Sequence, residues 1–349
     1  MEQVVTLGSH ELWRRARAVA DVARYGLSYA MVRYFVSAPV PLDPDHVWGF
    51  LTRPGPAWQD AFIQGYPFRF QRRWLLARRF SRSHADGIEE HYDVSNAFYR
   101  LFLDRDLMLY SCADFDRPDD TIETAQVRKA DYLLNLIQPR AGERILDLGC
   151  GWGGMMHHIH AHTGDRAGLR GMTLSREQAR YVSEKFGYDV VLEDFITAAF
   201  EPASYDKIYG IGSMEHVRPN EVLPLLRRLH QALAPTGRLV LHFFSLNGDD
   251  LPTSTITGQI FFPGSALSRY EDFLQAAGDA GFTITHDSTH DYRPTLRAWF
   301  DRLVQNRDEA IALVGVQTYN RYLTFFPASW TFFDQKQATL HRFVLEKAR

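Results

Sequence analysis

A glycine-rich turn directly after a short apolar segment is the feature that most constrains the fold. Residues 145–148 are predicted to form a buried parallel strand, and glycines follow at positions 149, 151, 153 and 154. Residues 155–162 contain no helix breaker and are predicted to form a helix. Such a strand–turn–helix unit lets a ligand approach the backbone closely and presents free N–H groups at the helix start. The unit therefore predicts a nucleotide-type site, with a tight turn between packed elements as the alternative.

The spacing of these glycines and the charges after later strands narrow the ligand class. Gly149, Gly151 and Gly153 follow a Gly-x-Gly-x-Gly pattern, which misses the dinucleotide fingerprint by one residue, and no Lys-Ser/Thr pair indicates a triphosphate loop. No anchored phosphate site is visible, and acidic residues such as Asp194 follow later predicted strands. Because carboxylates suit ribose hydroxyls, we expect an adenosine cofactor, S-adenosylmethionine rather than a nicotinamide.

Predicted strands and helices alternate along the rest of the chain. Further strands are predicted at 169–174, 190–192, 205–211, 238–244 and 282–285, and helices at 124–136, 175–186, 219–234 and 267–280. This alternation predicts an α/β fold with a doubly wound, mainly parallel sheet. Ligands of such sheets bind beyond the carboxyl ends of the strands. Those ends supply one ring of polar residues, which includes Gly149, Thr173, Asp194, Glu215 and His242.

The composition is that of an ordinary globular chain of one or two domains. The 349 residues are 45% hydrophobic and 23% charged, and the formal net charge of −3 gives no reason to expect nucleic acid as a partner. Two cysteines, Cys112 and Cys150, indicate no disulfide framework and fit a reducing cytosol. No apolar stretch is long enough to span a membrane. The histidines at 157–162 lack a companion set of cysteines or carboxylates, so no metal site is expected.

The amino-terminal part of the chain differs in character from the rest. Residues 12–34 have a helical apolar rhythm, a proline-rich break follows, and residues 68–82 mix arginines with aromatic side chains. We therefore expect a helical N-terminal domain over 1–82 and a main domain over 83–349. The basic segment suits an anionic membrane surface, with a solvated helix face as the alternative. A cytoplasmic, peripherally membrane-associated protein is the resulting expectation.

Several stretches of the chain carry a specific resemblance to a known family. They are residues 91–99, 110–113, 146–154, 171–178 and 215–217, followed by His242, Tyr292, Thr295, Leu296 and Trp299. In this order they resemble the cyclopropane-fatty-acyl-phospholipid synthase family of S-adenosylmethionine-dependent methyltransferases, over about residues 88–345. The resemblance implies a seven-stranded methyltransferase sheet with an N-terminal helical appendage.

The resemblance also implies a reaction and a set of residues. The family transfers the methyl group of S-adenosylmethionine to a cis double bond of an unsaturated phospholipid acyl chain at a membrane surface. A carbocation forms, and a bound bicarbonate removes a methyl proton so that a cyclopropane ring closes. Carried over residue by residue, the bicarbonate ligands and catalytic residues are Cys112, Glu215, His242 and Tyr292. The residues expected to bind S-adenosylmethionine are Tyr110, Ser111, Gly149, Gly151, Thr173, Gln178 and Asp194.

Two departures from the family pattern bear on this site. Arg218 follows Glu-His-Val where the family often has glycine, so the entry into the next helix is open to question. The segment Glu193-Asp194-Phe195 stands where the family usually has Asp-Tyr-Arg, which makes Asp194 the least secure cofactor residue. The oligomeric state is open, with a homodimer as one outcome, because N-terminal helical appendages often serve association.

Each candidate also has a simpler interpretation. Taken alone, Cys112 would be a small buried hydrophobe, His242 a satisfied core histidine and Glu215 a cap of the following helix. The aromatic residues between 319 and 333 suit either a pocket wall or core packing. One alternative function is a methyltransferase that forms a methyl-branched or methylene fatty acid, or acts on a small unsaturated natural product. Another is a non-catalytic lipid- or nucleoside-binding protein.

Overall fold

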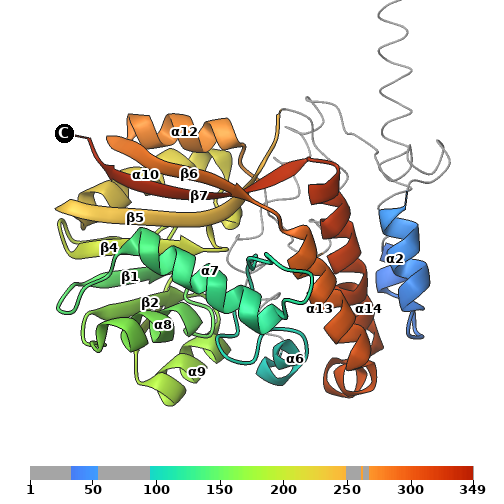
Figure 1. Ribbon diagram of the computed structural model, residues 1–349. Coiled ribbons are helices and arrows are strands. Elements are labelled where there is room, and N and C mark those ends of the chain that lie inside the picture. Colours follow the sequence, from blue (N-terminus) through green and yellow to red (C-terminus); the bar gives the residue numbers. More distant parts are fainter. Residues whose placement is uncertain (1–32, 54–94, 249–260, 262–266, 349) are drawn as a thin grey trace, which may run out of the picture.

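The computed structural model describes residues 33–53, 95–248, 261 and 267–348, which contain a seven-stranded sheet flanked by helices (Figure 1). The strands are β1 (Ile145–Leu148), β2 (Leu169–Thr173), β3 (Asp189–Leu192), β4 (Tyr205–Ile211), β5 (Leu233–Leu246), β6 (Phe282–His290) and β7 (Ala338–Lys347). The helices are α2 (Pro44–Thr52), α6 (Asn96–Arg100), α7 (Ile122–Ile137), α8 (Gly154–Thr163), α9 (Arg176–Phe186), α10 (Pro219–Ala232), α12 (Tyr270–Asp279), α13 (Arg293–Gln305) and α14 (Arg307–Asp334). None of the described helices has the length and apolar character needed to cross a bilayer.

The sheet has the strand order β3-β2-β1-β4-β5-β7-β6. Strands β1 to β5 pair in parallel, whereas β7 runs antiparallel to both of its neighbours, β5 and β6. This architecture confirms the predicted α/β fold with a mainly parallel, seven-stranded methyltransferase sheet. Strand β7 had no predicted counterpart, and β5 begins at Leu233 rather than at the predicted residue 238.

Helices cover both faces of the sheet, as a doubly wound fold requires. One hydrophobic core cluster joins the sheet to α10 and α12, and a second joins it to α7, α8 and α9. Local sequence signals explain where these helices start. The side chain of Ser175 accepts a hydrogen bond from Gln178 N and caps α9, and Thr121 and Thr124 form a reciprocal capping box at α7.

A third core cluster is built from helices beside the sheet. It gathers aromatic side chains from α6, α13 and α14, among them Phe98, Tyr99, Trp299, Tyr322 and Phe326. Helices α13 and α14 had no predicted counterpart, although the aromatic residues of α14 were recognised. Of the two interpretations of those residues, core packing is the one observed for the fully buried Tyr319, Tyr322 and Phe326.

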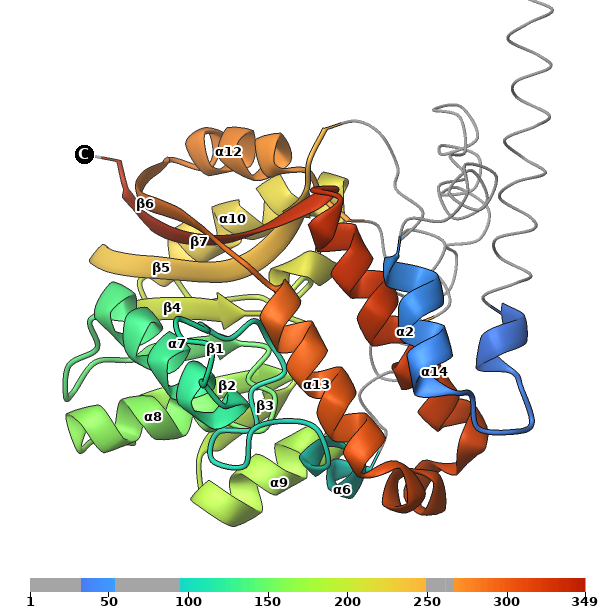
Figure 2. The ribbon, with the colours of Figure 1, turned by 45° about the vertical axis from the view of Figure 1, so that its right-hand side comes forward.

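Part of the predicted N-terminal domain packs on this helical cluster. Helix α2 lies along α14 in both views of the ribbon, and its Val47 is buried in the shared core (Figure 2). The predicted basic segment 68–82 and nearly all of the predicted helix at 12–34 lie outside the described residues. The domain boundary at residue 82 lies in the same gap and stays a prediction.

Candidate active site

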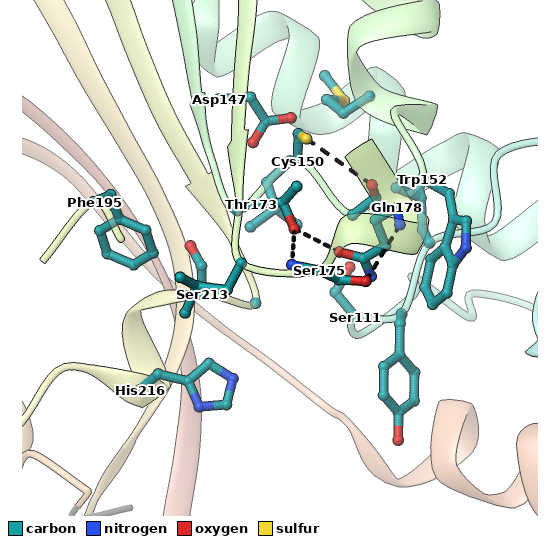
Figure 3. Close-up of a pocket in the computed structure, with 18 of the residues that line it drawn as sticks. Ser111, Asp147, Cys150, Trp152, Thr173, Ser175, Gln178, Phe195, Ser213 and His216 are labelled. Atoms are coloured by element: carbon teal, nitrogen blue, oxygen red, sulfur yellow. Dashed lines mark hydrogen bonds between the residues drawn. The ribbon is translucent and has the colours of Figure 1, made fainter. Parts of the chain in front are cut away.

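A pocket opens at the carboxyl ends of β1, β2 and β4. It encloses about 890 Å³ of space, part of it open to solvent. In Figure 3, Thr173, Gln178 and Ser111 lie on one side of this pocket and Ser213 and His216 on the other. The lining residues are Met108, Leu109, Tyr110, Ser111, Asp147, Gly149, Cys150, Gly151, Trp152, Met155, Thr173, Leu174, Ser175, Gln178, Glu193, Asp194, Phe195, Ile196, Ile211, Gly212, Ser213 and His216.

The glycine-rich turn forms one wall of the pocket, and its conformation requires glycine. Gly149, Gly151 and Gly153 have positive φ angles of 85°, 53° and 78°. A Cβ atom on Gly149 would lie 2.8 Å from the Cβ atom of Ser213. One on Gly154 would lie 1.9 Å from the carbonyl oxygen of Leu107. The turn therefore lines a pocket and also lets packed segments approach closely, so its two alternative interpretations do not exclude each other.

All seven residues predicted to bind the cofactor line this pocket: Tyr110, Ser111, Gly149, Gly151, Thr173, Gln178 and Asp194. Their role in binding stays a prediction, whereas their convergence is a structural finding. The hydroxyl of Thr173 donates to Gln178 Oε1 over 2.8 Å and accepts from Ser175 N over 3.2 Å. These bonds fix the polar side chains at the end of β2. Asp194 uses its carboxylate to accept from Ile196 N over 2.9 Å, so it also shapes its own loop.

Two buried polar residues of α7 support the pocket and were missed in the sequence. Gln126 Nε2 donates to the carbonyl oxygens of Leu109 and Ser111 over 3.0 and 2.9 Å. Lys129 Nζ donates to Ser111 Oγ over 2.8 Å, and burial lowers the pKa of this amine to about 7. Both lie on the buried face of an amphipathic helix. Two polar residues three positions apart on an apolar face were the available signal.

A buried carboxylate holds the loop that leads into the pocket. Asp104 accepts hydrogen bonds from the backbone N–H groups of Leu107, Met108 and Leu109 over 2.6, 2.9 and 2.7 Å. Asp147, in β1, is a second buried acid, and its pKa is raised to about 7 by burial. Unlike Asp104, Asp147 lines the pocket itself.

The four predicted catalytic residues lie next to the pocket rather than in its lining. Cys112 follows the lining residue Ser111, and Glu215 precedes the lining residue His216. Cys112 is fully buried, and burial raises the pKa of its thiol to about 12. Its Sγ donates to the carbonyl oxygen of Asp291 over 3.4 Å, which places it beside Tyr292.

Glu215 and His242 are buried polar residues with unused hydrogen-bonding atoms. Burial raises the pKa of Glu215 to about 8, so the carboxyl is largely protonated at neutral pH. Its Oε2 atom and the Nε2 atom of His242 have no hydrogen-bond partner among the described residues. Buried polar atoms of this kind are costly unless a ligand pairs with them. His242 is thus not a fully satisfied core histidine.

The four residues converge on the end of β5. The backbone of Phe244 donates to the carboxyl of Glu215, and the rings of Phe244 and Tyr292 lie 6.5 Å apart. His242 precedes Phe244 by two positions on β5, so both side chains leave the same face of the strand. The alternative that Glu215 caps the following helix is wrong. Arg218 is the N-cap of α10, and its backbone N–H donates to Glu221 over 3.0 Å.

Two features define a class of protein: a seven-stranded sheet in which β7 runs antiparallel to its neighbours, and a glycine-lined pocket at the carboxyl ends of the parallel strands. They are those of the α/β methyltransferases. The family model for mycolic acid cyclopropane synthetase matches residues 80–343. The chain therefore belongs to this family, whose members are S-adenosylmethionine-dependent methyltransferases.

Named relatives agree with this assignment. The cyclopropane mycolic acid synthase MmaA2 of Mycobacterium tuberculosis is 30% identical over 283 residues, which cover 76% of this chain and 98% of the relative. The solved structure of MmaA2 from the same organism superimposes with a TM-score of 0.69 at 29% identity, covering 76% and 98% of the two chains. The structure of the mycolic acid cyclopropane synthase CmaA1 with SAH and CTAB has the same TM-score at 28% identity and covers 76% and 98% of the two chains.

Proposed function

We propose that this enzyme transfers the methyl group of S-adenosylmethionine to a cis double bond of an unsaturated phospholipid acyl chain and forms a cyclopropane fatty acid. The observation that carries the proposal is that two features of the site lie together at one edge of the sheet. One is the glycine-lined pocket, and the other is the set of two buried residues, Glu215 and His242, whose Oε2 and Nε2 atoms have no partner among the described residues. Cyclopropane synthase relatives at about 30% identity support the reaction type.

The reaction places specific demands on the residues around the double bond. When bound, S-adenosylmethionine supplies an electrophilic methyl group, and bicarbonate accepts the proton that this group loses as the ring closes. The protein must exclude water from the carbocation, since hydration would give an alcohol instead of a ring. Phe244, Tyr292 and Phe333 form such an apolar surface, with ring centroids 5.0–6.5 Å apart. Aromatic faces also stabilise positive charge.

The chemistry of the four catalytic candidates fits a small anion. A protonated Glu215, a neutral His242 and the Tyr292 hydroxyl are hydrogen-bond donors, and the Cys112 thiol is a fourth donor once it exchanges the Asp291 carbonyl oxygen for the anion. The raised pKa values of Glu215 and Cys112 keep both protons in place at neutral pH. A buried set of neutral donors can bind an anion without being deprotonated by it, and the anion then remains available as the base. These four residues would hold the bicarbonate.

A phospholipid substrate distinguishes this proposal from the activity in the names of the relatives, which refers to mycolic acids. Support comes from the resemblance over about residues 88–345 and from the arginine- and aromatic-rich segment 68–82. Such a segment suits anionic headgroups. We propose accordingly that the enzyme works at the cytoplasmic membrane surface as a peripheral protein.

Vesicles of a mono-unsaturated phospholipid test the proposal directly. Incubation with the enzyme and S-adenosylmethionine should add fourteen mass units to the acyl chain, as a methylene group does, and remove the double bond. Glu215→Gln should bind S-adenosylhomocysteine with nearly unchanged affinity but lose most of its turnover. A product that retains a double bond would instead indicate a methyl-branched or methylene fatty acid. No mass gain on any unsaturated phospholipid would refute the proposed substrate.

A further inference from the structure

A fully buried arginine contacts the candidate catalytic histidine from the neighbouring strand. Arg342 lies in β7 directly opposite His242 of β5, and its side chain is 0% exposed. Its Nε atom donates to His242 Nδ1 over 3.1 Å. No signal in the sequence marks Arg342, because β7 had no predicted counterpart and an arginine in a strand is normally exposed.

A carboxylate fixes the guanidinium group in this position. The two terminal nitrogens of Arg342 donate to the two oxygens of Asp114 over 2.8 and 2.6 Å. This bidentate pair restricts the planar guanidinium in both position and orientation. The ring of Tyr132 covers one face, with Cζ of Arg342 4.6 Å from its centroid. Arg342 is therefore held from several sides, and Nε is the nitrogen that it presents to His242.

The chemistry of arginine determines the protonation of the facing nitrogen. An arginine side chain has only donors and does not lose its proton in proteins. Its contact with Nδ1 therefore requires a lone pair on that atom, and the single N–H of a neutral imidazole must then be on Nε2. The ring is neutral because burial lowers its pKa, and the positive charges of Arg342 and Lys129 lower it further.

We propose that Arg342 is a positioning residue that holds His242 in the Nε2–H tautomer, so that His242 acts as a hydrogen-bond donor in the active site and not as a base. Nε2 is the atom of His242 that has no partner among the described residues. The histidine thereby offers its proton to an acceptor and has no lone pair left to receive the proton of the reaction. The assignment of the tautomer does not depend on the proposed function. The role of His242 as a donor during catalysis does rest on that function.

Nitrogen NMR of the imidazole rings tests the tautomer itself. In the wild-type enzyme labelled with ¹⁵N-histidine, the signals lost in His242→Gln identify the ring. We expect Nδ1 to have the chemical shift of an unprotonated nitrogen and Nε2 that of a protonated one. In Arg342→Met this preference should be lost, so that protonated Nδ1 appears. A wild-type His242 with its proton on Nδ1, or an unchanged spectrum in Arg342→Met, would overturn the proposal.

Arg238→Met is the matched control. Arg238 also pairs β5 with β7, through a bond of 2.6 Å to Glu346, but at a partly exposed position away from His242. The Arg238→Met variant should leave the His242 spectrum unchanged. For Arg342→Met we expect kcat to fall by about 10- to 100-fold, by analogy with the loss of hydrogen-bond partners that orient metal-binding histidines. KM for S-adenosylmethionine should stay within about twofold, because Arg342 is not part of the pocket lining.

Arg342→Met alone leaves Asp114 without its buried partner and could impair folding. A double variant avoids this problem. Asp114→Asn with Arg342→Met removes both charges and should show the same loss of tautomer preference. Failure of the inference and failure of the proposed function give different results. An Nε2–H wild-type ring in an enzyme that forms no cyclopropane leaves the tautomer standing and refutes the function. A cyclopropane product from an enzyme whose His242 carries its proton on Nδ1 supports the proposed function and refutes the tautomer.

Discussion

At the scale of the single residue, burial sets the protonation state of Glu215 and makes stability depend on pH. The pKa of this carboxyl is about 8 in the folded protein, against 4.5 for an ordinary glutamate. Between these values the native state retains a proton that the unfolded state has released. The stabilisation is therefore complete below pH 4.5 and is lost as the pH rises through about 8.

Glu215→Gln should remove this dependence, because an amide does not titrate. The free energy of unfolding of the variant, relative to wild type, should increase by about 1.4 kcal/mol per pH unit. The gain should begin near pH 4.5 and level off above about 8, reaching on the order of 5 kcal/mol. Urea titrations of both proteins at several pH values measure this difference in unfolding free energy. Contributions from groups that titrate in both proteins, such as Asp147, cancel in the difference. Glu193→Gln, at an exposed position of the pocket wall, is the control. A difference that does not change with pH would contradict the assigned protonation.

Residue types were predictable at this scale, but their environments were not. All seven cofactor candidates line one pocket because motifs at strand ends keep their order and spacing. Arg342 contacts the site from β7, and no periodic pattern marks it, whereas Lys129 contacts the site from α7 and is marked only as a polar position on an apolar helix face. A buried charge is recognisable only when its partner is known, and Asp114 is 228 positions from Arg342.

At the scale of the element, the start of α8 depends on the absence of a side chain at Gly154. A methyl group there would meet the Leu107 carbonyl oxygen at 1.9 Å, and a backbone atom cannot move aside as a flexible side chain does. Residues 108–111, which follow Leu107, line the pocket. The glycine thus connects helix packing to the shape of the binding site.

Gly154→Ala should therefore both destabilise the protein and weaken cofactor binding. We expect a loss of about 1–3 kcal/mol of stability, the usual cost of an overpacked site, and at least about tenfold weaker binding of S-adenosylhomocysteine. Urea unfolding and calorimetric titration measure the two effects. Gly278→Ala, in α12 with open space around the new methyl group, should be neutral or stabilising by up to about 1 kcal/mol. Equal behaviour of the two variants would show that the contact with Leu107 is unimportant.

Helices and strands with a clear periodic pattern of apolar residues were predicted from the sequence. Those that depend on tertiary contacts were not. The strand at Ile145–Leu148 and the helix capped by Ser175 follow from local patterns. Strand β7 contains the buried polar residues His341 and Arg342 in the middle of its apolar run, which obscures the pattern of a central strand. Helix α14 contains Pro327 and a non-helical Gly315, so its sequence resembles several short segments.

At the scale of the whole molecule, one buried amide joins the N-terminal segment to the C-terminal helices. Asn320 of α14 is fully buried, and its Oδ1 accepts from Leu42 N over 3.0 Å. Its Nδ2 donates to the carbonyl oxygens of Ala38 and Val40 over 3.3 and 2.9 Å. These bonds satisfy backbone groups in the segment before α2, which otherwise has few regular partners. The amide therefore determines how firmly α2 is docked.

Asn320→Ala should release this docking while leaving the sheet intact. Loss of the three bonds should cost about 1–3 kcal/mol, since buried backbone groups are left without partners. The expected result is faster amide hydrogen exchange in Pro44–Thr52, with unchanged exchange in the sheet strands β1 and β4. Asn247→Ala is the matched control, because Asn247 also donates two side-chain bonds of 2.8 Å but is exposed. Faster exchange throughout the sheet in Asn320→Ala would mean that α2 and the sheet unfold as one cooperative unit. Unchanged exchange in α2 would mean that the aromatic contacts of Trp48 with Phe300 and Trp330 suffice to hold this helix in place.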